Sequence, residues 1–450
     1  MTKCMTEGSP LRLIMNFALP LLLGNLFQQT YNMVDAAIVG QTLGADALAG
    51  VGASSSVQFL VLGFCIGIAC GFAVPVAQAF GANELPLMRR YIWHSVVLTV
   101  CFAAALTVLC VLLCPAILHL LQTPDSIFPM AYQYLLVIFI GIPCTLLYNL
   151  CSSVLRAVGD SRTPFYFLAF SAFLNIGLDF FCILVLGWGV AGAAIATVFS
   201  QGLSGVLCVV LIFRKFRVLI PSKNERTMSR QIAGRTLAMG VPMGLQYSIT
   251  AIGSMVMQSA NNSLGSVYVS GFTAGMKIKQ FTMCPFDALA TSVSTFCSQN
   301  LGAGHIDRIR RGIRIGFIAG VLYGLGIGVF MILFGRTLSM LFVSAKYGSV
   351  LDASAKYLRC MGFFYWVLGL LNVARYTTQG LGYSNRAIFS GVTEMIARCF
   401  VSFVFVPYFG YTAICFADQT AWVAASCYIV PTLFFCVKEC RAKFQKKLVQ

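Results

Sequence analysis

Long apolar segments recur along the whole chain and constrain its fold more than any other feature. Each is long enough for an α-helix to cross a bilayer, which takes about 20 residues. Twelve such segments follow in order: 11–39, 46–76, 91–121, 128–155, 164–186, 190–213, 234–262, 266–298, 312–343, 353–380, 387–408 and 411–437. Because 58% of the residues are hydrophobic and only 10% are charged, a water-soluble fold is excluded. The sequence predicts an all-α polytopic membrane protein with twelve transmembrane helices.

The basic residues concentrate in alternate connections between these segments. The connections on one side hold Arg89, Arg90, Arg156, Arg162, seven Lys and Arg residues from Arg214 to Arg235, Arg308, Arg310, Arg311, Arg314, Arg386, and the cluster from Lys438 to Lys447. Those on the other side hold no Lys or Arg, apart from one with Arg336, Lys346, Lys356 and Arg359. Lys and Arg favour cytoplasmic loops. The net charge of +17 therefore indicates a multi-pass plasma (bacterial inner) membrane protein with both termini cytoplasmic, and not a nucleic-acid partner.

The second half of the chain repeats the first. A shift of 221 residues superposes Gly44 on Gly265, Gln78 on Gln299, and Arg89 with Arg90 on Arg310 with Arg311; a shift of 223 superposes Asn149 on Asn372 and Gly159 on Gly382. Six spans in each repeat give both halves the same orientation. We expect two pseudo-symmetric lobes, residues 1–213 and 234–437, joined by a cytoplasmic basic linker, 214–233, and followed by a cytoplasmic basic tail, 438–450.

The first span carries a polar stripe that ends in an acid. Asn25, Gln28, Asn32 and Asp35 are spaced 3, 4 and 3 residues apart, so they share one helix face. An ionisable residue within a span is costly, and a functional role is the default hypothesis; the alternative is that Asp35 snorkels or caps the helix end. Pro20 precedes the stripe and predicts a bend or a bendable point.

A second acid lies in the fifth span. Asn175 and Asp179 are four residues apart and hence share a helix face, and Thr197 in the sixth span can reach a neighbouring helix. At the repeat shifts the counterparts of Asp35, Asn175 and Asp179 are Val256, Arg398 and Ser402. The pair of acids therefore belongs to the first half alone. Two carboxylates in a poorly hydrated pocket could take up a proton or hold a Na⁺.

The second half offers weaker signals. The seventh span carries Ser254 and Gln258 on one face but no charge, and Lys277 lies in the eighth span. Glu394 and Arg398 have the favourable i, i+4 order for an ion pair, which is either structural or part of substrate binding. Asp418 is the second acid to consider if this half takes part in coupling.

The chain lacks the sequence motifs of metal sites, nucleotide-binding loops and common hydrolases. Its 18 cysteines include no C-x-x-C pair, and its three histidines share no motif. There is no G-x-x-x-x-G-K-[ST], G-x-S-x-G or H-E-x-x-H sequence. We therefore expect no enzyme activity, no ATP use and no cofactor, and no metal beyond a possible Na⁺ at the acids.

Five stretches together resemble the multidrug and toxic compound extrusion (MATE) transporters. They are N-x-x-D-A-A-I-V-G from Asn32, the pair Q-A-F-G-A and Q-N-L-G-A, L-R-A-V-G-D-S-R-T-P from Leu155, and L-N-I-G-L-D from Leu174. The resemblance covers essentially the whole chain. It implies a two-lobe antiporter that expels organic, often cationic compounds in exchange for Na⁺ or H⁺. It further implies that Asp35, Asn175, Asp179 and Thr197 match the cation-coupling cluster, with Pro20 at the bend of the first helix.

Several alternatives stay open at this stage. Asn25, Gln28 and Asn32, and with them Ser254 and Gln258, are candidates for the wall of a substrate cavity or for hydrogen-bonding glue between helices. A lipid-linked saccharide flippase is the second transport hypothesis, and a membrane-embedded enzyme is the hypothesis from another class. The expected partners are small organic substrates and the bilayer, with the monomer as the functional unit.

Overall fold

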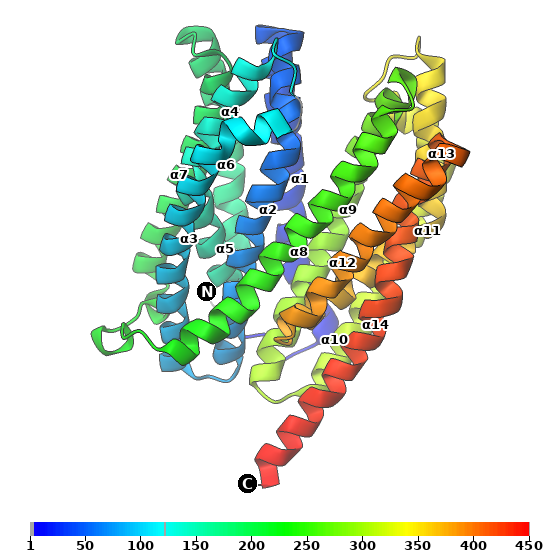
Figure 1. Ribbon diagram of the computed structural model, residues 1–450. Helices are drawn as coiled ribbons and strands as arrows, with labels where there is room; N and C mark the ends of the chain where they lie inside the picture. Colours follow the sequence, from blue (N-terminus) through cyan, green and yellow to red (C-terminus); the bar gives the residue numbers. More distant parts are fainter. Residues whose placement is uncertain (1–3, 121–122, 450) are drawn as a thin grey trace. The chain divides into compact units, whose positions relative to one another are not determined.

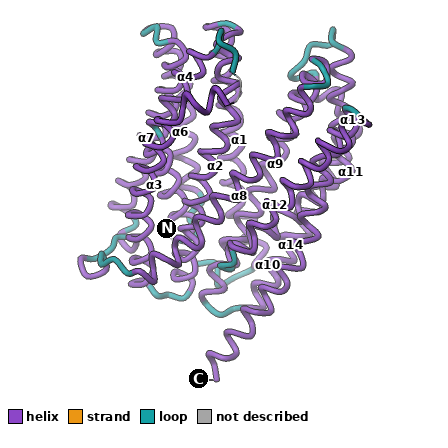
Figure 2. The backbone as a smooth tube through the Cα atoms, viewed as in Figure 1, coloured by secondary structure: helices purple, strands orange, loops and turns teal. Residues whose placement is uncertain are grey.

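The computed structural model describes residues 4–120 and 123–449, which form helices joined by short connections (Figures 1 and 2). The first half contains α1 (Pro10–Leu43), α2 (Ala45–Gly81), α3 (Leu85–Leu120), α4 (Phe128–Ile140), α5 (Ile142–Ala157), α6 (Arg162–Phe180), η1 (Phe181–Val185) and α7 (Gly189–Lys215). Two short turns, η2 (Arg217–Leu219) and η3 (Lys223–Glu225), lead to the second half. That half contains α8 (Arg230–Asn262), α9 (Ser266–Gly302), α10 (Ile306–Ser339), α11 (Gly348–Gly380), α12 (Ser384–Phe400), η4 (Val401–Phe405), α13 (Val406–Phe409) and α14 (Tyr411–Val449).

Most of these helices can cross a bilayer. Within the described ranges, nine are long and apolar enough, and the pair α4 and α5, bent by 47° at Gly141, makes a tenth. Helices α8 and α9, of 33 and 37 residues, are as long as the others but carry more polar residues. Backbone groups in lipid must be hydrogen-bonded internally, which a helix achieves. The predicted all-α membrane fold is confirmed, with six long helical segments before the linker and six after it.

The internal repeat is visible in the structure. Helices α2 and α9 begin and end exactly 221 residues apart, and α6 and α12 both run into a five-residue π-helix, η1 and η4. The turn before each long helix repeats as well: Gly44 and Gly265 have φ of 90° and 103°, and Gly159 and Gly382 have φ of 84° and 91°. Residues with a side chain rarely adopt this left-handed conformation. The matching glycines in the sequence therefore mark matching turns.

The chain forms two compact units, and the linker is not the boundary between them. One unit contains Leu23–Gly244 with Cys4, and the other contains Met5–Leu22 with the chain from Leu245 onward. The chain therefore passes from one unit to the other inside α1 and inside α8. The predicted boundaries at residues 213 and 234 differ from this division, because the linker and the start of α8 pack with the first half.

The linker is held on the first unit by an ion pair. Arg89 on α3 contacts Glu225 at 2.8 Å, and the Glu225 carboxylate also accepts a hydrogen bond from the backbone N–H of Ser222. The backbone N–H of Ser229 donates to His94 Nε2 over 2.8 Å. The hydrogen bonds from Arg89 lower the pKa of Glu225 to about 2. Residues 214–233 are therefore an ordered strap and not a loose linker.

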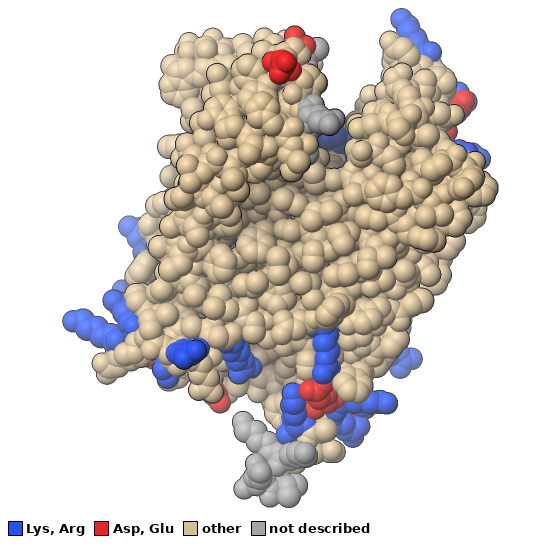
Figure 3. Space-filling model, in the orientation of Figure 1, with Lys and Arg blue, Asp and Glu red and all other residues tan. Residues whose placement is uncertain are grey.

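Charged side chains are rare on the outer surface between the helix ends (Figure 3). On the face drawn in Figure 3, Lys and Arg lie toward the helix ends in each unit, and the surface between is almost entirely uncharged. Exposed large apolar side chains such as Leu112, Phe173, Leu322 and Phe403 cover this surface. This distribution suits contact with lipid. The basic tail continues α14 as a helix to Val449.

Candidate functional site

Two buried acids meet in the first unit. Asp35 lies on α1 and is 9% exposed, and Asp179 near the end of α6 is fully buried. Their carboxyl groups lie close enough to influence each other electrostatically. Asp35 lies within the continuous helix α1, and its side chain is buried by the packing of the first unit. The structure thus brings together two acids that lie 144 positions apart in the sequence.

Two neutral side chains complete this group. Asn175 on α6 is 2% exposed, and its Nδ2 donates a hydrogen bond to Thr197 Oγ1 on α7 over 3.3 Å. The Thr197 hydroxyl donates in turn to the backbone carbonyl of Ala193 over 3.1 Å. The small residues Ala193 and Ala194 are fully buried and allow α7 to pack closely. All four predicted residues, Asp35, Asn175, Asp179 and Thr197, are therefore neighbours in one unit.

Most of the oxygens in this acid cluster lack a hydrogen-bond partner. Asp35 Oδ1, Asn175 Oδ1 and both carboxylate oxygens of Asp179 are buried and unpaired among the described residues. Buried polar atoms are normally hydrogen-bonded, so each exception needs an explanation. An arrangement of acceptor oxygens alone suits a cation, either a proton or a hard ion such as Na⁺. Two adjacent buried carboxylates also repel each other unless a cation lies between them.

Two buried tyrosines that the sequence interpretation missed lie near the acids. Tyr31, one turn before Asp35, is influenced by Gln28 and Gln201 as well as by both acids, and Tyr134 on α4 by Gln58 and both acids. Both rings are buried, with exposures of 8% and 5%. The spacing of Tyr31 from Asp35 is a helix-face signal that was available in the sequence. Tyr134 was not assignable, because no pattern connects α4 to α1.

The polar stripe on α1 is only partly buried. Asn25 and Gln28 are half-buried, and Asn32 is exposed. Helix α1 is continuous through Pro20, whose ring lies inside the helix. On α8, Ser254 donates to the carbonyl of Thr250 over 3.2 Å and Gln258 bonds to Asn262 over 2.8 Å. The stripe residues Asn25 and Asn32 therefore do not belong to the acid cluster. Gln28 is connected to it only by way of Tyr31.

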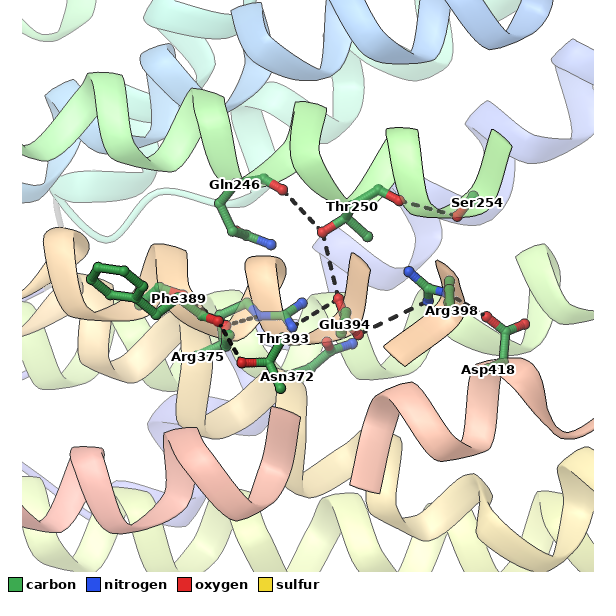
Figure 4. A network of polar contacts seen from close by, with 12 residues as sticks. Gln246, Thr250, Ser254, Asn372, Arg375, Phe389, Thr393, Glu394, Arg398 and Asp418 are labelled. Carbon is green, nitrogen blue, oxygen red and sulfur yellow. Dashed lines mark hydrogen bonds and ion pairs between the residues drawn. The ribbon is translucent and has the colours of Figure 1, made fainter. Parts of the chain in front are cut away.

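The second unit holds a network of ion pairs where the first holds the acid cluster (Figure 4). Asp418 on α14 is fully buried and binds Lys279 of α9, Arg398 of α12 at 3.0 Å, and the hydroxyl of Tyr357 at 2.8 Å. Lys279 also lies 5.2 Å from the ring centre of Trp422. Both carboxylate oxygens of Asp418 are thus occupied by cationic side chains of the protein itself.

Glu394 continues this ion-pair network toward α8 and α11. Its carboxylate lies 3.0 Å from Arg375 and 4.0 Å from Arg398, and Thr250 donates to it over 3.4 Å. Figure 4 shows these groups in a row between α8 and α14. Asn372 bonds to Asp287 over 3.4 Å at the α9–α11 interface. The predicted i, i+4 pair exists, but its members have closer partners, Arg375 for Glu394 and Asp418 for Arg398.

One predicted residue of the second half lies outside the network. Lys279, and not Lys277, reaches Asp418; Lys277 is half-buried on the same helix two residues earlier. Two residues shift the direction of a helical side chain by about 200°, so the two lysines face opposite ways. Among the described residues, no three His, Cys, Asp or Glu side chains are placed to hold a metal ion.

Known transporters are similar to this chain in both sequence and fold. The MatE family model matches residues 20–181 and 242–404. The probable multidrug resistance protein YpnP of Bacillus subtilis is 32% identical over 368 residues, 81% of each chain, and the probable multidrug resistance protein NorM of Thermotoga maritima is 27% identical over 406 residues, 88% of this chain and 86% of that one. The outward-facing structure of a MATE family transporter of the MOP superfamily superposes with a TM-score of 0.91 at 20% identity, over 97% of this chain and 98% of that one. This chain belongs to the MatE family of multidrug and toxic compound extrusion (MATE) transporters.

Proposed function

We propose that this transporter is a secondary antiporter that exports organic, often cationic compounds in exchange for Na⁺ or H⁺. Two curated relatives carry names that describe multidrug resistance, which supports the class of cargo. In this proposal Asp35, Asn175, Asp179 and Thr197 bind the coupling ion. The cycle follows alternating access, in which a site opens to one side of the membrane at a time.

One observation carries the proposal. Among the described residues, four buried oxygens of the acid cluster have no hydrogen-bond partner, and two of its residues are acids near enough to influence each other electrostatically. A site that was structural only would be expected to satisfy these atoms within the protein. The buried acid of the second unit has its oxygens satisfied by the protein, because each oxygen of Asp418 has a cationic partner. An exchangeable cation at the acid cluster accounts for the difference.

The exchange follows from charge neutralisation. A cation between Asp35 and Asp179 removes their repulsion, and Asn175 and Thr197 add neutral oxygens. Asp35 lies on α1, so the occupied and empty sites favour different positions of this helix. Pro20 supplies a point at which α1 can bend, since the ring removes one backbone hydrogen bond. If the bend closes the space that cargo occupies, ion uptake and cargo binding exclude each other, as exchange requires.

The proposal also includes localisation and orientation. The protein lies in the plasma membrane with both termini in the cytoplasm, as the distribution of Lys and Arg favours. The ion gradient is the only power source, and the monomer is the functional unit. The ion-pair network of Lys279, Glu394, Arg398 and Asp418 stabilises the second unit and does not exchange ions.

The test is transport driven by an imposed ion gradient. Purified protein is reconstituted into liposomes, and the liposomes are loaded with the fluorescent cation ethidium. A Na⁺ gradient and a H⁺ gradient are then applied in separate runs. Asp35→Asn and Asp179→Asn should abolish gradient-driven ethidium movement, whereas Asp46→Asn, an exposed acid at the start of α2, should leave it unchanged. Unaltered gradient-driven transport by both variants would exclude the acid cluster as the coupling site.

A further inference from the structure

Helices α1 and α8 pass from one compact unit into the other at matching positions. The crossing in α1 falls between Leu22 and Leu23, and the crossing in α8 falls between Gly244 and Leu245. Each lies two residues after a proline inside the helix, Pro20 in α1 and Pro242 in α8. A shift of 222 residues superposes both the prolines and the crossings. The feature is therefore part of the internal repeat and is present twice.

The start of α8 is fastened to the first unit by glycines. A Cβ on Gly67 would lie 2.7 Å from the Cα of Gly244, and a Cβ on Gly71 would lie 2.5 Å from the Cα of Gly240. Two pairs of glycines four residues apart therefore bring the backbones of α2 and α8 into contact. Such an interface is closely packed and tolerates no larger residue. The first turns of α8 are held as part of the first unit.

A polar latch lies further along the same interface. Arg235 donates from Nη2 to Gln78 Oε1 over 2.9 Å and lies 5.8 Å from the ring centre of Tyr91. The strap before α8 adds the pairs Arg89–Glu225 and His94–Ser229. The segment up to Gly244 thus has anchors on both α2 and α3, although it belongs by sequence to the second half.

The start of α1 has the equivalent latch in the second unit. Gln299 on α9, the counterpart of Gln78 at the 221 shift, accepts a hydrogen bond from the backbone N–H of Met5 over 2.8 Å. The Met5 carbonyl accepts from Asn300 Nδ2 and Arg308 Nη2 over 3.2 and 3.1 Å, and the Gly8 carbonyl accepts from Arg308 Nη1 over 2.9 Å. Ile14, Phe17 and Leu21 then pack in the core of this unit.

We infer that Pro242 is a second hinge of the transport cycle, equivalent to Pro20, and that Gln78 and Gln299 are positioning residues that hold the two crossing helices. Each helix is anchored at its start in one unit while the rest belongs to the other. Any relative motion of the units must then be absorbed within α1 and α8. The weakest points are the carbonyls of Asn16 and Ala238, which lose their helical hydrogen bonds to Pro20 and Pro242. This inference rests on the proposed alternating-access cycle.

The inference predicts that stiffening α8 slows transport without weakening cargo binding. Pro242→Ala restores the missing backbone hydrogen bond, so ethidium turnover in liposomes should fall roughly threefold or more while the ethidium Kd stays the same. Pro242→Gly keeps the helix easy to bend and should retain most of the turnover. Pro431→Ala is the matched control, because α14 lies entirely within the second unit.

The contacts of Gln78 with Arg235 and of Gln299 with Met5 are tested by measuring ethidium turnover and the ethidium Kd. Gln78→Ala and Gln299→Ala should change turnover by a similar factor, because the two residues are equivalent in the repeat, and should leave the ethidium Kd unchanged.

Wild-type turnover in Pro242→Ala, or an equal loss in Pro431→Ala, would overturn the second hinge. If Pro242→Ala lowers the melting temperature, the test uses Pro242→Gly instead. A loss of turnover in Pro242→Gly would also count against the inference. Failure of the proposed function has a different signature: wild-type transport would then be insensitive to the ion gradient.

Discussion

Asn175 donates its amide hydrogen to the Thr197 hydroxyl across the α6–α7 interface, over 3.3 Å, and its own Oδ1 is buried with no hydrogen-bond partner in the described part of the chain. The hydrogen bond fixes which end of the amide faces Thr197. The oxygen end is thereby free to join the unpaired oxygens of Asp35 and Asp179. A neutral pair thus orients an acceptor beside two acids.

Thr197→Val should weaken binding of the coupling ion without unfolding the protein around the site. Valine keeps the shape of threonine but cannot accept the Asn175 hydrogen bond, so the amide loses its orientation. A net hydrogen bond of about 1 kcal/mol predicts that the Na⁺ or H⁺ concentration for half-maximal transport rises roughly fivefold to tenfold. The measurement is ethidium transport against ion concentration. Thr30→Val, an exposed threonine on α1, is the control and should not shift the curve.

Asp418→Asn should destabilise the second unit strongly. The change leaves Lys279 and Arg398 buried without their shared carboxylate. Breaking one member of a buried ionic group costs about 3–5 kcal/mol. A large fall in the melting temperature of the purified protein is expected. The exposed pair Arg336–Asp352 provides the comparison, since Asp352→Asn should change stability by less than about 1 kcal/mol.

Low pH should weaken the attachment of residues 217–229 to α3, because Glu225 becomes protonated and its ion pair with Arg89 is lost. Its folded-state pKa of about 2 lies below the ordinary value of 4.5, so its contribution to stability is complete above pH 4.5 and is lost as the pH falls toward 2. Proteolysis of the 217–229 segment should therefore accelerate across this pH window. Glu225→Gln should be cleaved faster at pH 7 already and show a weaker pH dependence. Equal cleavage of both proteins at every pH would contradict the proposed role of the ion pair.

Gly71→Ala should separate α2 from the start of α8. The new methyl group would meet the backbone of Met239 and Gly240, which cannot move aside as a side chain can. Overpacking of this kind costs about 1–3 kcal/mol, visible as a lower melting temperature. Gly52→Ala on the same helix is the control, because no atom lies within 4 Å of the added Cβ. A destabilisation by Gly52→Ala as large as that by Gly71→Ala would contradict the close contact.

The sequence predicts the helices well. Hydropathy depends only on neighbouring residues, and the 221-residue repeat is visible by comparing one half of the sequence with the other. Asp35, Asn175, Asp179 and Thr197 could be grouped because helix spacing and the resemblance agreed on them. The choice between Lys277 and Lys279 could not be made, since it depends on which face of α9 meets α14.

The packing of the helix starts was also beyond the sequence. Residues 214–233 read as a basic linker, and only the structure shows Arg89 and Glu225 joining it to α3. Likewise the repeat relates Gln78 to Gln299, but nothing in it shows that one binds Arg235 and the other Met5. Such partners lie far apart in the chain and are set by tertiary packing.

Coupling between ion and cargo is tested by measuring ion movement that cargo drives. Liposomes containing the transporter receive an inward ethidium gradient with no ion gradient, and ²²Na⁺ release and internal pH are followed together. We expect opposite movement of one of these ions in the wild type and none in Asp179→Asn, whose protein should still bind ethidium. Ethidium transport with no counter-movement of Na⁺ or H⁺, or counter-movement that persists in Asp179→Asn, would show that Asp179 does not couple an ion to cargo.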